Sequence, residues 1–259
     1  NPCIECNRHL KFDRLVRRAD ALGFDMIATG HHARVVSTPA GPRLGRGVDA
    51  AKDQSYVLHV IEESVLARML LPVGELTKAE VRRLAMDLDL RTAQKPESQD
   101  VCFITNEHGR AAFLGQRIPL KSAAVVDRSG EQVGQVDSVE MVTIGQRKGL
   151  GLAGGTDPKY VVDVDVTAEG DRRVMIGEKA DLVAPVTELE SWRWVGEPVD
   201  GSLRFQCSAH GRVESGRIED GRRVVWDEPH RRIAAGQSVV GYDADDVVVG
   251  GGIAGRTPL

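Results

Sequence analysis

The hydrophobic pattern of this 259-residue chain changes its period near Gln116. Before that residue, apolar side chains recur at helical spacing between short apolar runs. After it, they alternate in short segments that glycine and aspartate turns separate. Helices between buried strands are typical of an α/β domain, and short alternating strands are typical of a small sheet or barrel. The sequence therefore predicts an α/β domain followed by β-rich domains.

The first third carries the α/β pattern. Apolar residues at helical spacing predict a helix over Lys11 to Leu22 that Gly23 ends, and a short buried strand is expected from Asp25. Residues 38–49 are rich in Pro, Gly and Arg and predict a loop or hairpin. The spacing within Thr77–Glu80 matches a capping box, which opens a further helix.

Polar residues follow the first strand. Ligands of open α/β sheets lie beyond the carboxyl ends of the strands, so Gly30, His31 and His32 are placed where a ligand could bind. A surface loop is the alternative interpretation of the two histidines. Adjacent histidines point in different directions, so we do not expect a metal site that uses both.

A second polar segment precedes an apolar run. Asp53 or Ser55 could cap a helix that continues towards Ile61. Capping would explain these two residues but not Lys52 and Gln54.

Three of the four cysteines stand in positions that suggest chemistry. Cys3 and Cys6 form a Cys-x2-Cys pair before the first helix, and Cys6 is expected at the helix N-terminus, where the dipole lowers a thiol pKa. Cys102 lies between a polar loop and an apolar segment in which Val101, Phe103 and Ile104 are expected to be buried. Such thiols suggest a sulfur relay, a reversible disulfide or metal ligands.

The alternative for Cys102 is a small buried hydrophobe, which is what most free cysteines are. Cys207 falls in a predicted strand and is expected in the core.

The rest of the chain predicts strands and turns. Segments around Val125, Val136 and Tyr160–Val166 alternate, and four short strands are expected further on, at Leu203–Cys207, Arg223–Trp226, Val239–Val240 and Val247–Gly252. The loop Thr143–Gly151 lacks the Walker order of residues. Its Gln146, Arg147 and Lys148 could contact phosphates, and a plain glycine-rich turn is the alternative.

Composition sets limits on the function. The net charge of −4 gives no global basic signature, so any RNA binding must use local patches. No run approaches the roughly 20 apolar residues of a membrane helix, and no signal peptide is recognised. Four cysteines are too few for a disulfide scaffold and indicate a reducing compartment. We expect a cytoplasmic protein without a membrane partner.

Eight motifs in order resemble the bacterial-type tRNA-specific 2-thiouridylases, ATP-dependent sulfurtransferases, over essentially the whole chain. They are Asn1–Asn7, Ala28–His31, Lys52–Tyr56, Pro72–Leu76, Ser98–Ile104, Thr143–Gly151, Gly236–Ser238 and Gly250–Gly252. The resemblance implies the remainder of an ATP pyrophosphatase-type, Rossmann-like α/β domain over residues 1–108, a small central β-rich domain over 109–185 and a C-terminal β-barrel over 186–259.

The resemblance also implies a reaction. The family replaces the C2 oxygen of the wobble uridine of tRNA with sulfur, using ATP, with Mg²⁺ expected, and a sulfur-donor protein. Cys102 would carry the sulfur as a persulfide, and Cys6 would be the catalytic nucleophile that ends in a Cys6–Cys102 disulfide. A persulfide is a strong nucleophile at neutral pH, and a second thiol can cleave it by exchange.

Further roles carry over by position. Gly30 would contact ATP, and Asn1, Pro2 and Cys3 match the segment that meets the target base. The expected tRNA contacts are His31, Lys52, Asp53, Gln54, Arg212 and Gln237.

The chain departs from the family pattern in three places. The Ser-Gly-Gly-x-Asp-Ser loop that binds ATP is not found in these residues, so we expect a fragment that does not adenylate uridine by itself. Cys3 stands where some members carry Asp. Only the Arg of an Arg-Tyr pair is matched, by Arg212 in Arg212–Val213.

Two alternatives stay open. An iron–sulfur cluster on Cys3, Cys6 and Cys102 could carry the sulfur. The β-rich half could instead be an RNA-binding module without catalysis, because barrels of this kind often bind RNA although the fold alone does not prove it.

Overall fold

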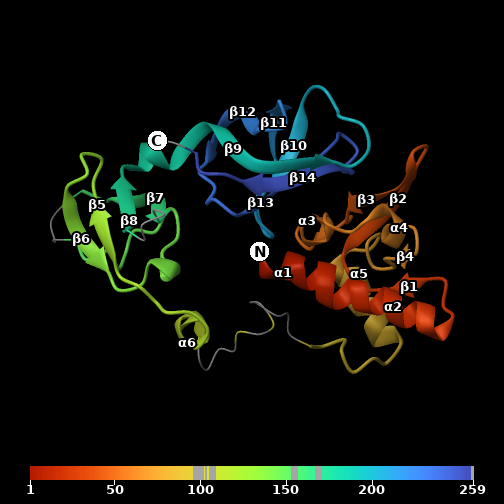
Figure 1. Cartoon of the computed structure of the whole chain (residues 1–259). Coiled ribbons are helices and arrows are strands. Elements are labelled where there is room, and N and C mark those ends of the chain that lie inside the picture. Colours follow the sequence, from red (N-terminus) through yellow and green to blue (C-terminus); the bar gives the residue numbers. More distant parts are fainter. Residues whose placement is uncertain (96–101, 103, 105–108, 153–156, 167–170, 258–259) are drawn as a thin grey trace. The chain divides into compact units, whose positions relative to one another are not determined.

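A computed structural model describes residues 1–95, 102, 104, 109–152, 157–166 and 171–257 (Figure 1). The chain divides into two compact units. The first holds Asn1–Glu97, Leu189–Asp227 and Gln237–Ala254, and the second holds Ser98–Glu188, Glu228–Gly236 and Gly255–Leu259. Segments far apart in the sequence therefore fold together in each unit.

A helical stretch opens the first unit. It runs through α1 (Pro2–Glu5), the π-helical η1 (Cys6–Phe12) and α2 (Asp13–Leu22), and Gly23 ends it in the left-handed conformation. The predicted helix to Leu22 and its end at Gly23 are confirmed. The predicted place of Cys6 at a helix N-terminus is wrong, because Asn1 caps a helix that already begins at Pro2.

Short elements complete the α/β half. Strand β1 (Ile27–Ala28) pairs in parallel with β4 (Met69–Leu70), and β2 (Ala33–Thr38) forms a hairpin with β3 (Gly41–Arg46). The helices are α3 (Ser55–Leu58), α4 (Glu63–Leu66) and α5 (Lys78–Asp87). The capping box at the start of α5 is confirmed.

The predicted helix from Ser55 towards Ile61 is too long. Helix α3 is a single turn that ends at Leu58, and its N-cap residue is Gln54, which makes no side-chain capping bond.

The C-terminal strands close into the expected barrel, in the order β10-β11-β12-β9-β14-β13. They are β9 (Val183–Trp194), β10 (Leu203–Gln206), β11 (Glu214–Glu219), β12 (Arg223–Arg231), β13 (Ser238–Tyr242) and β14 (Val248–Ala254). Closure leaves no edge strand unpaired. Cys207 directly follows β10 instead of lying within it.

The second unit is built on a four-stranded sheet of order β6-β5-β8-β7. Its strands are β5 (Ala123–Val126), β6 (Gln132–Val136), β7 (Tyr160–Val166) and β8 (Arg172–Gly177). It also contains α6 (Gly109–Gly115), η2 (Val139–Met141) and η3 (Lys179–Leu182). Its own core includes Val125, Val161, Val174 and Leu150.

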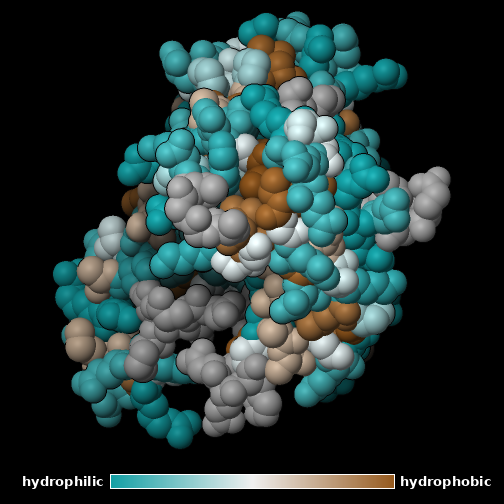
Figure 2. Space-filling view, turned by 90° about the vertical axis from the view of Figure 1, so that its left-hand side faces the viewer, coloured by the Kyte–Doolittle hydropathy of each residue, from teal (hydrophilic) through white to brown (hydrophobic). Residues whose placement is uncertain are grey.

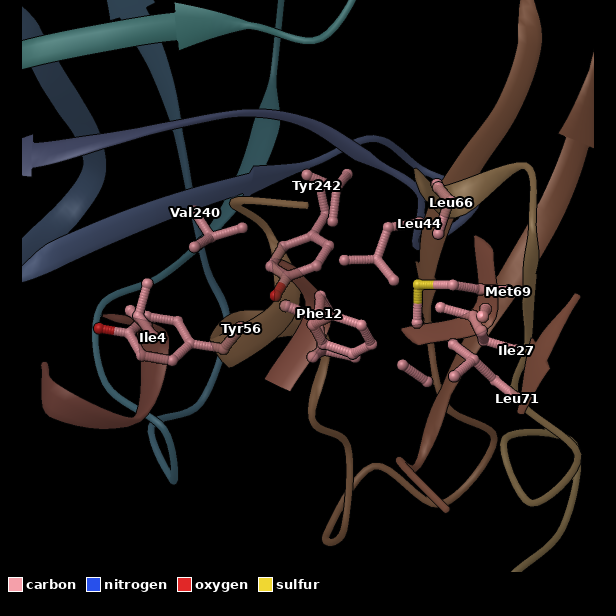
Figure 3. Close-up of a cluster of buried hydrophobic side chains, with 14 residues drawn as sticks. Ile4, Phe12, Ile27, Leu44, Tyr56, Leu66, Met69, Leu71, Val240 and Tyr242 are labelled. Atoms are coloured by element: carbon pink, nitrogen blue, oxygen red, sulfur yellow. The ribbon is translucent and has the colours of Figure 1, made fainter. Parts of the chain in front are cut away.

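One hydrophobic cluster joins the α/β half of the first unit to the barrel. Tyr56 of α3 and Tyr242 of β13 are fully buried in it, beside Ile4 of α1 and Val240 of β13 (Figure 3). Burying an aromatic side chain stabilises a fold by about 1.5–3 kcal/mol. The two halves therefore share a core.

Glycines of β14 allow close approach at this junction. A Cβ atom on Gly251 would overlap the ring of His59, and one on Gly250 would collide with Trp192. The adjacent side-chain positions of a strand face opposite sides. Gly251 thus lets His59 of the α/β half pack closely on one face of β14, and Gly250 lets Trp192 pack on the other.

The surface view in Figure 2 is mostly hydrophilic, with a few hydrophobic patches. Among the described residues, no helix combines the length and apolar character that a membrane span requires.

The hydroxyl of Tyr242 provides a test of the shared core. It donates to Gln206 Oε1 (3.2 Å) and lies 3.0 Å from Ser55 Oγ. We expect Tyr242→Phe to lower the free energy of unfolding of the whole first unit by about 1–2 kcal/mol, because buried partners lose their hydrogen bonds. Urea denaturation measures this.

Tyr160→Phe in the second unit is the matched control, since its hydroxyl bonds to no other described residue. Equal effects of the two substitutions would contradict the prediction.

Candidate functional site

The helix that carries Cys3 and Cys6 is held in place by the residues that follow each cysteine, which are buried. Ile4 and Asn7 are each 2% exposed and lie one turn apart on the buried face. Cys3 and Cys6 precede them and are half-buried. The Asn1 side chain caps the helix, because its Oδ1 accepts from the backbone N–H of Cys3 at 3.0 Å. The backbone that carries both thiols is therefore held in place, and the thiols themselves are only partly shielded.

Asn7 anchors this helix to α3. Its Nδ2 donates to the carbonyl of Val57 at 3.2 Å. Its Oδ1 is buried and has no hydrogen-bond partner among the described residues. A buried amide oxygen without a hydrogen-bond partner costs free energy. Asn7, next to Cys6, therefore lowers the stability of the fold to some extent.

His31 lies against the same helical stretch. It is 9% exposed, its Nδ1 is 2.9 Å from Thr29 Oγ1, and its Nε2 is 3.5 Å from Lys11 Nζ. Phe12 packs on the ring with centroids 5.7 Å apart. Burial, followed by the charge of Lys11, lowers the pKa of His31 to about 4. The imidazole is thus neutral at pH 7.

The predicted ligand loop and the Lys52–Gln54 segment are brought together. The backbone N–H of Gln54 donates to the carbonyl of His32 at 2.8 Å, and Gln54 Oε1 accepts from the His32 N–H at 2.9 Å. The Gln54 side chain therefore replaces a strand partner for this loop. Lys52 is half-buried beside it.

Asp53 is buried and saturated with donors. Its Oδ1 accepts from the backbone N–H groups of Gly47 (2.9 Å) and Ser55 (3.1 Å), and its Oδ2 accepts from Ser55 Oγ (2.8 Å) and Arg46 Nε (3.1 Å). Arg46 also donates to Asp246 at 3.2 Å. These hydrogen bonds give Asp53 a structural role. Its contact with tRNA stays a prediction.

Gly30 follows β1 and is exposed. A Cβ atom there would meet no other atom within 4 Å, so the space above its backbone is open. This position at the carboxyl end of a parallel strand fits the close approach of a nucleotide.

Cys102 belongs to the second unit and is exposed. The predicted burial of Val101 and Phe103 lies outside the described residues, and Ile104 is half-buried. Within the described parts of the chain, no three His, Cys, Asp or Glu side chains gather as metal ligands.

Cys207 is half-buried, so its expected place in the core is not confirmed by its exposure. Desolvation, and then the charge of Glu214, raises the pKa of Cys207 to about 12. Such a thiol stays protonated and unreactive at neutral pH.

The remaining predicted contacts lie on the barrel. Arg212 is exposed between β10 and β11, and Gln237 is half-buried just before β13, with its carbonyl accepting from Ala254 at 2.8 Å. No hydrogen bond links either residue to the cysteine helix among the described contacts.

The sequence reasoning missed His59. Its Nδ1 donates to the carbonyl of Tyr56 at 2.8 Å, and its ring lies under Gly251. Burial lowers the pKa of His59 to about 4. A single histidine in an apolar run gives no sequence signal, because its partner is a glycine almost 200 residues away.

Profiles of known families match three consecutive parts of the chain. The profile described as "tRNA methyl transferase HUP domain" matches residues 1–106, "tRNA methyl transferase PRC-barrel domain" matches 111–177, and "Aminomethyltransferase beta-barrel domain" matches 187–254.

Curated relatives match almost the whole chain. The tRNA-specific 2-thiouridylase MnmA of Carboxydothermus hydrogenoformans is 41% identical over 267 residues, which cover 99% of this chain and 72% of the relative. The proteins of the same name from Trichormus variabilis and Mycolicibacterium smegmatis are each 40% identical, over 96% and 99% of this chain and 73% of each relative.

Asp53→Ala tests the buried network. We expect it to lower the free energy of unfolding by about 3–5 kcal/mol, because Arg46 would lose one of its two carboxylate partners and the N–H groups of Gly47 and Ser55 would lose their buried acceptor. Asp20→Ala is the control, since Asp20 pairs with Arg68 at the surface, where such pairs contribute about 0–1 kcal/mol. Equal losses in urea denaturation would contradict this structural role.

The lowered pKa values of His31 and His59 predict that stability depends on pH. The unfolded chain binds their protons near pH 6.5, whereas the folded chain binds them near pH 4. The free energy of unfolding should therefore be constant above pH 6.5. It should fall by up to about 1.4 kcal/mol per pH unit and histidine as the pH drops towards 4.

Denaturation at pH 7, 6 and 5 measures this slope, and His59→Gln should reduce it. His210→Gln, at an exposed position, is the control. A slope that His59→Gln leaves unchanged would exclude His59 as a source.

Proposed function

Because the chain belongs to the tRNA-specific 2-thiouridylase family, we propose that it acts in the ATP-dependent 2-thiolation of the wobble uridine of tRNA. The observation that carries the proposal is the Cys3–Cys6 helix. Its thiols are half-buried, its buried face is anchored by Ile4 and Asn7, and it lies against the loop that carries His31. A thiol used in exchange needs this combination of fixed direction and access.

We also propose three functional domains, over residues 1–108, 109–185 and 186–259. The consecutive profile matches support these boundaries. The first compact unit groups residues 1–97 of the first domain with most of the third around a common core, whereas residues 98–108 fall in the second unit.

Cys102 is proposed as the sulfur carrier. Its exposure would let a sulfur-donor protein deliver a sulfur atom to it as a persulfide. ATP, with Mg²⁺, would supply activation of the uridine C2 oxygen, so that this oxygen can leave with AMP. The terminal persulfide sulfur then forms the new bond to C2, and the displaced oxygen leaves with the phosphate.

Cys6 is proposed to complete the transfer. Its thiolate attacks Sγ of Cys102 and breaks the bond between Cys102 and the transferred sulfur, which stays on C2 with the electron pair. The two thiols are thereby oxidised to a Cys6–Cys102 disulfide, and the sulfane sulfur is reduced. A dithiol reductant must then return both cysteines to thiols.

The remaining residues would bind substrates. Gly30 is proposed to contact ATP, because the space above its backbone is open. Asn1, Pro2 and Cys3 would meet the target base, which must be flipped out of its stack to be reached. Proposed tRNA contacts are His31, Lys52, Asp53, Gln54, Arg212 and Gln237.

For the buried His31 and Asp53, the hydrogen bonds described above support a role in shaping the loop backbone that would face the RNA.

A second form of the sulfur carrier is an iron–sulfur cluster on Cys3, Cys6 and Cys102. The half-buried positions of Cys3 and Cys6 one turn apart favour it, because thiolates at this spacing can share a metal.

The test is mass spectrometry of the natural gene product after incubation with a cysteine-derived sulfur donor. We expect one extra sulfur on the Cys102 peptide. Adding tRNA and ATP should remove it and form the Cys6–Cys102 disulfide. Cys6→Ser should retain the persulfide but abolish the disulfide and lower thiolation of tRNA by at least about 1,000-fold, as the loss of a nucleophile does.

Cys3→Ser separates the two carriers, because it lies on the same helix and is equally half-buried. It should leave the persulfide intact, whereas a cluster would be lost together with its iron. Cys207→Ser is the control for a half-buried thiol whose pKa is raised. If thiolated tRNA stayed unchanged in cells whose only copy of the protein carries Cys6→Ser and Cys102→Ser, the alternative of a non-catalytic RNA-binding module would be favoured instead.

A further inference from the structure

The loop Thr143–Gly151 of the second unit is held rigidly by its own side chain and by two strands. Gln146 Oε1 accepts from the N–H of Thr143 at 3.1 Å, and Gln146 Nε2 donates to the carbonyl of Lys148 at 2.8 Å. The backbone of Gln146 accepts from Val161 of β7 at 2.9 Å. Both ends of the loop tip are therefore tied through one glutamine.

The flanks of the loop are anchored in the sheet. Leu150 is 2% exposed and belongs to the core of the second unit. The N–H of Gly145 donates to the carbonyl of Val161 at 2.7 Å. Gly145 has a φ of +83°, and a Cβ atom there would overlap the guanidinium of Arg231, which donates to Ile144 at 3.2 Å. Glycine is needed at this position on both grounds.

The tip of this rigid loop presents positive charge. Arg147 and Lys148 are exposed, and neither forms an ion pair with another described residue. Arg231 lies under the loop at Gly145, and Arg110 donates to the carbonyl of Met141 at 3.3 Å, just before the loop begins.

The nearby carboxylate of Glu140 is already engaged by the N–H of Lys121 and by Ser138 Oγ at 3.1 Å each. Glu140 therefore accepts hydrogen bonds from Lys121 and Ser138 rather than from the basic side chains of the loop tip. The tip is left as a locally basic surface on a chain whose net charge is −4.

Backbone donors add to this charge. The N–H groups of Arg147, Lys148 and Gly149 have no acceptor among the described residues. Phosphate oxygens accept both from backbone N–H groups and from Arg and Lys side chains. A loop that holds both kinds of donor in one fixed conformation binds an anion at a low entropic cost.

We propose that the loop Thr143–Gly151 is a preformed site for the phosphate backbone of tRNA, in which Arg147 and Lys148 contact phosphates and Gln146 holds the loop in shape. The proposal rests on the proposed function, which makes tRNA the substrate. The loop supplies affinity and takes no part in the sulfur chemistry.

The test compares tRNA binding by the natural gene product at salt concentrations from about 50 to 200 mM. Replacing both charges, with Arg147→Glu and Lys148→Glu, should weaken binding roughly tenfold at low salt. It should also reduce the slope of log K against log salt by about 1 to 2, since about 0.7 to 0.9 counterions are released per phosphate contact. In thiolation assays KM for tRNA should rise while kcat is kept.

Two further variants separate charge from shape. Arg17→Glu with Arg18→Glu makes the same charge change at adjacent exposed residues of α2 and should alter binding much less. Gln146→Ala removes both ties of the loop and keeps its charges. It should weaken binding several-fold without changing the salt slope.

The outcomes are distinguishable. If the unaltered protein binds tRNA but the loop pair and the α2 pair have equal effects, the loop site is excluded and the proposed thiolation stands. If the unaltered protein does not bind tRNA at all, both proposals fail.

Discussion

Burial of Tyr56 and Tyr242 in one apolar cluster is the constraint on which the first unit depends. Both rings are fully buried, although 186 residues separate them in the sequence. Each hydroxyl then needs a partner in the core, which the carbonyl of Ser238 (3.0 Å) provides for Tyr56 and Gln206 for Tyr242. Moving the barrel away from the α/β half would expose both rings, and it would break the bond from Tyr56 to Ser238 and the contact of the Tyr242 hydroxyl with Ser55 Oγ.

The cysteine helix depends on the same core. Ile4 packs into the cluster near Val240 of the barrel (Figure 3), and Asn7 bonds to the backbone of α3, so the barrel helps to hold the helix that carries both thiols. The barrel thus contributes to the scaffold of the helix that carries Cys3 and Cys6, although its strands lie nearly 200 residues later in the sequence.

Polar residues in the candidate site have structural roles besides the functions proposed for them. Asp53 receives four donors, and Gln54 ties the loop that follows β1 to the start of α3. Such satisfied networks keep a loop rigid without secondary structure, and a rigid loop can present its backbone to a ligand. Gln146 in the second unit acts on the same principle, because one amide holds the basic loop tip at both ends.

The sequence by itself determined the features that follow local rules. The helix ending at Gly23, the capping box of Thr77 and the alternating strands of the barrel were all predicted, because each depends on residues within a few positions. The motif resemblance likewise identified the family. Tertiary structure alone decided the rest: the contact of His59 with Gly251, the saturation of Asp53 and the shared core. These features depend on pairs of residues far apart in the chain. The local sequence around one residue does not indicate which distant residue it will contact.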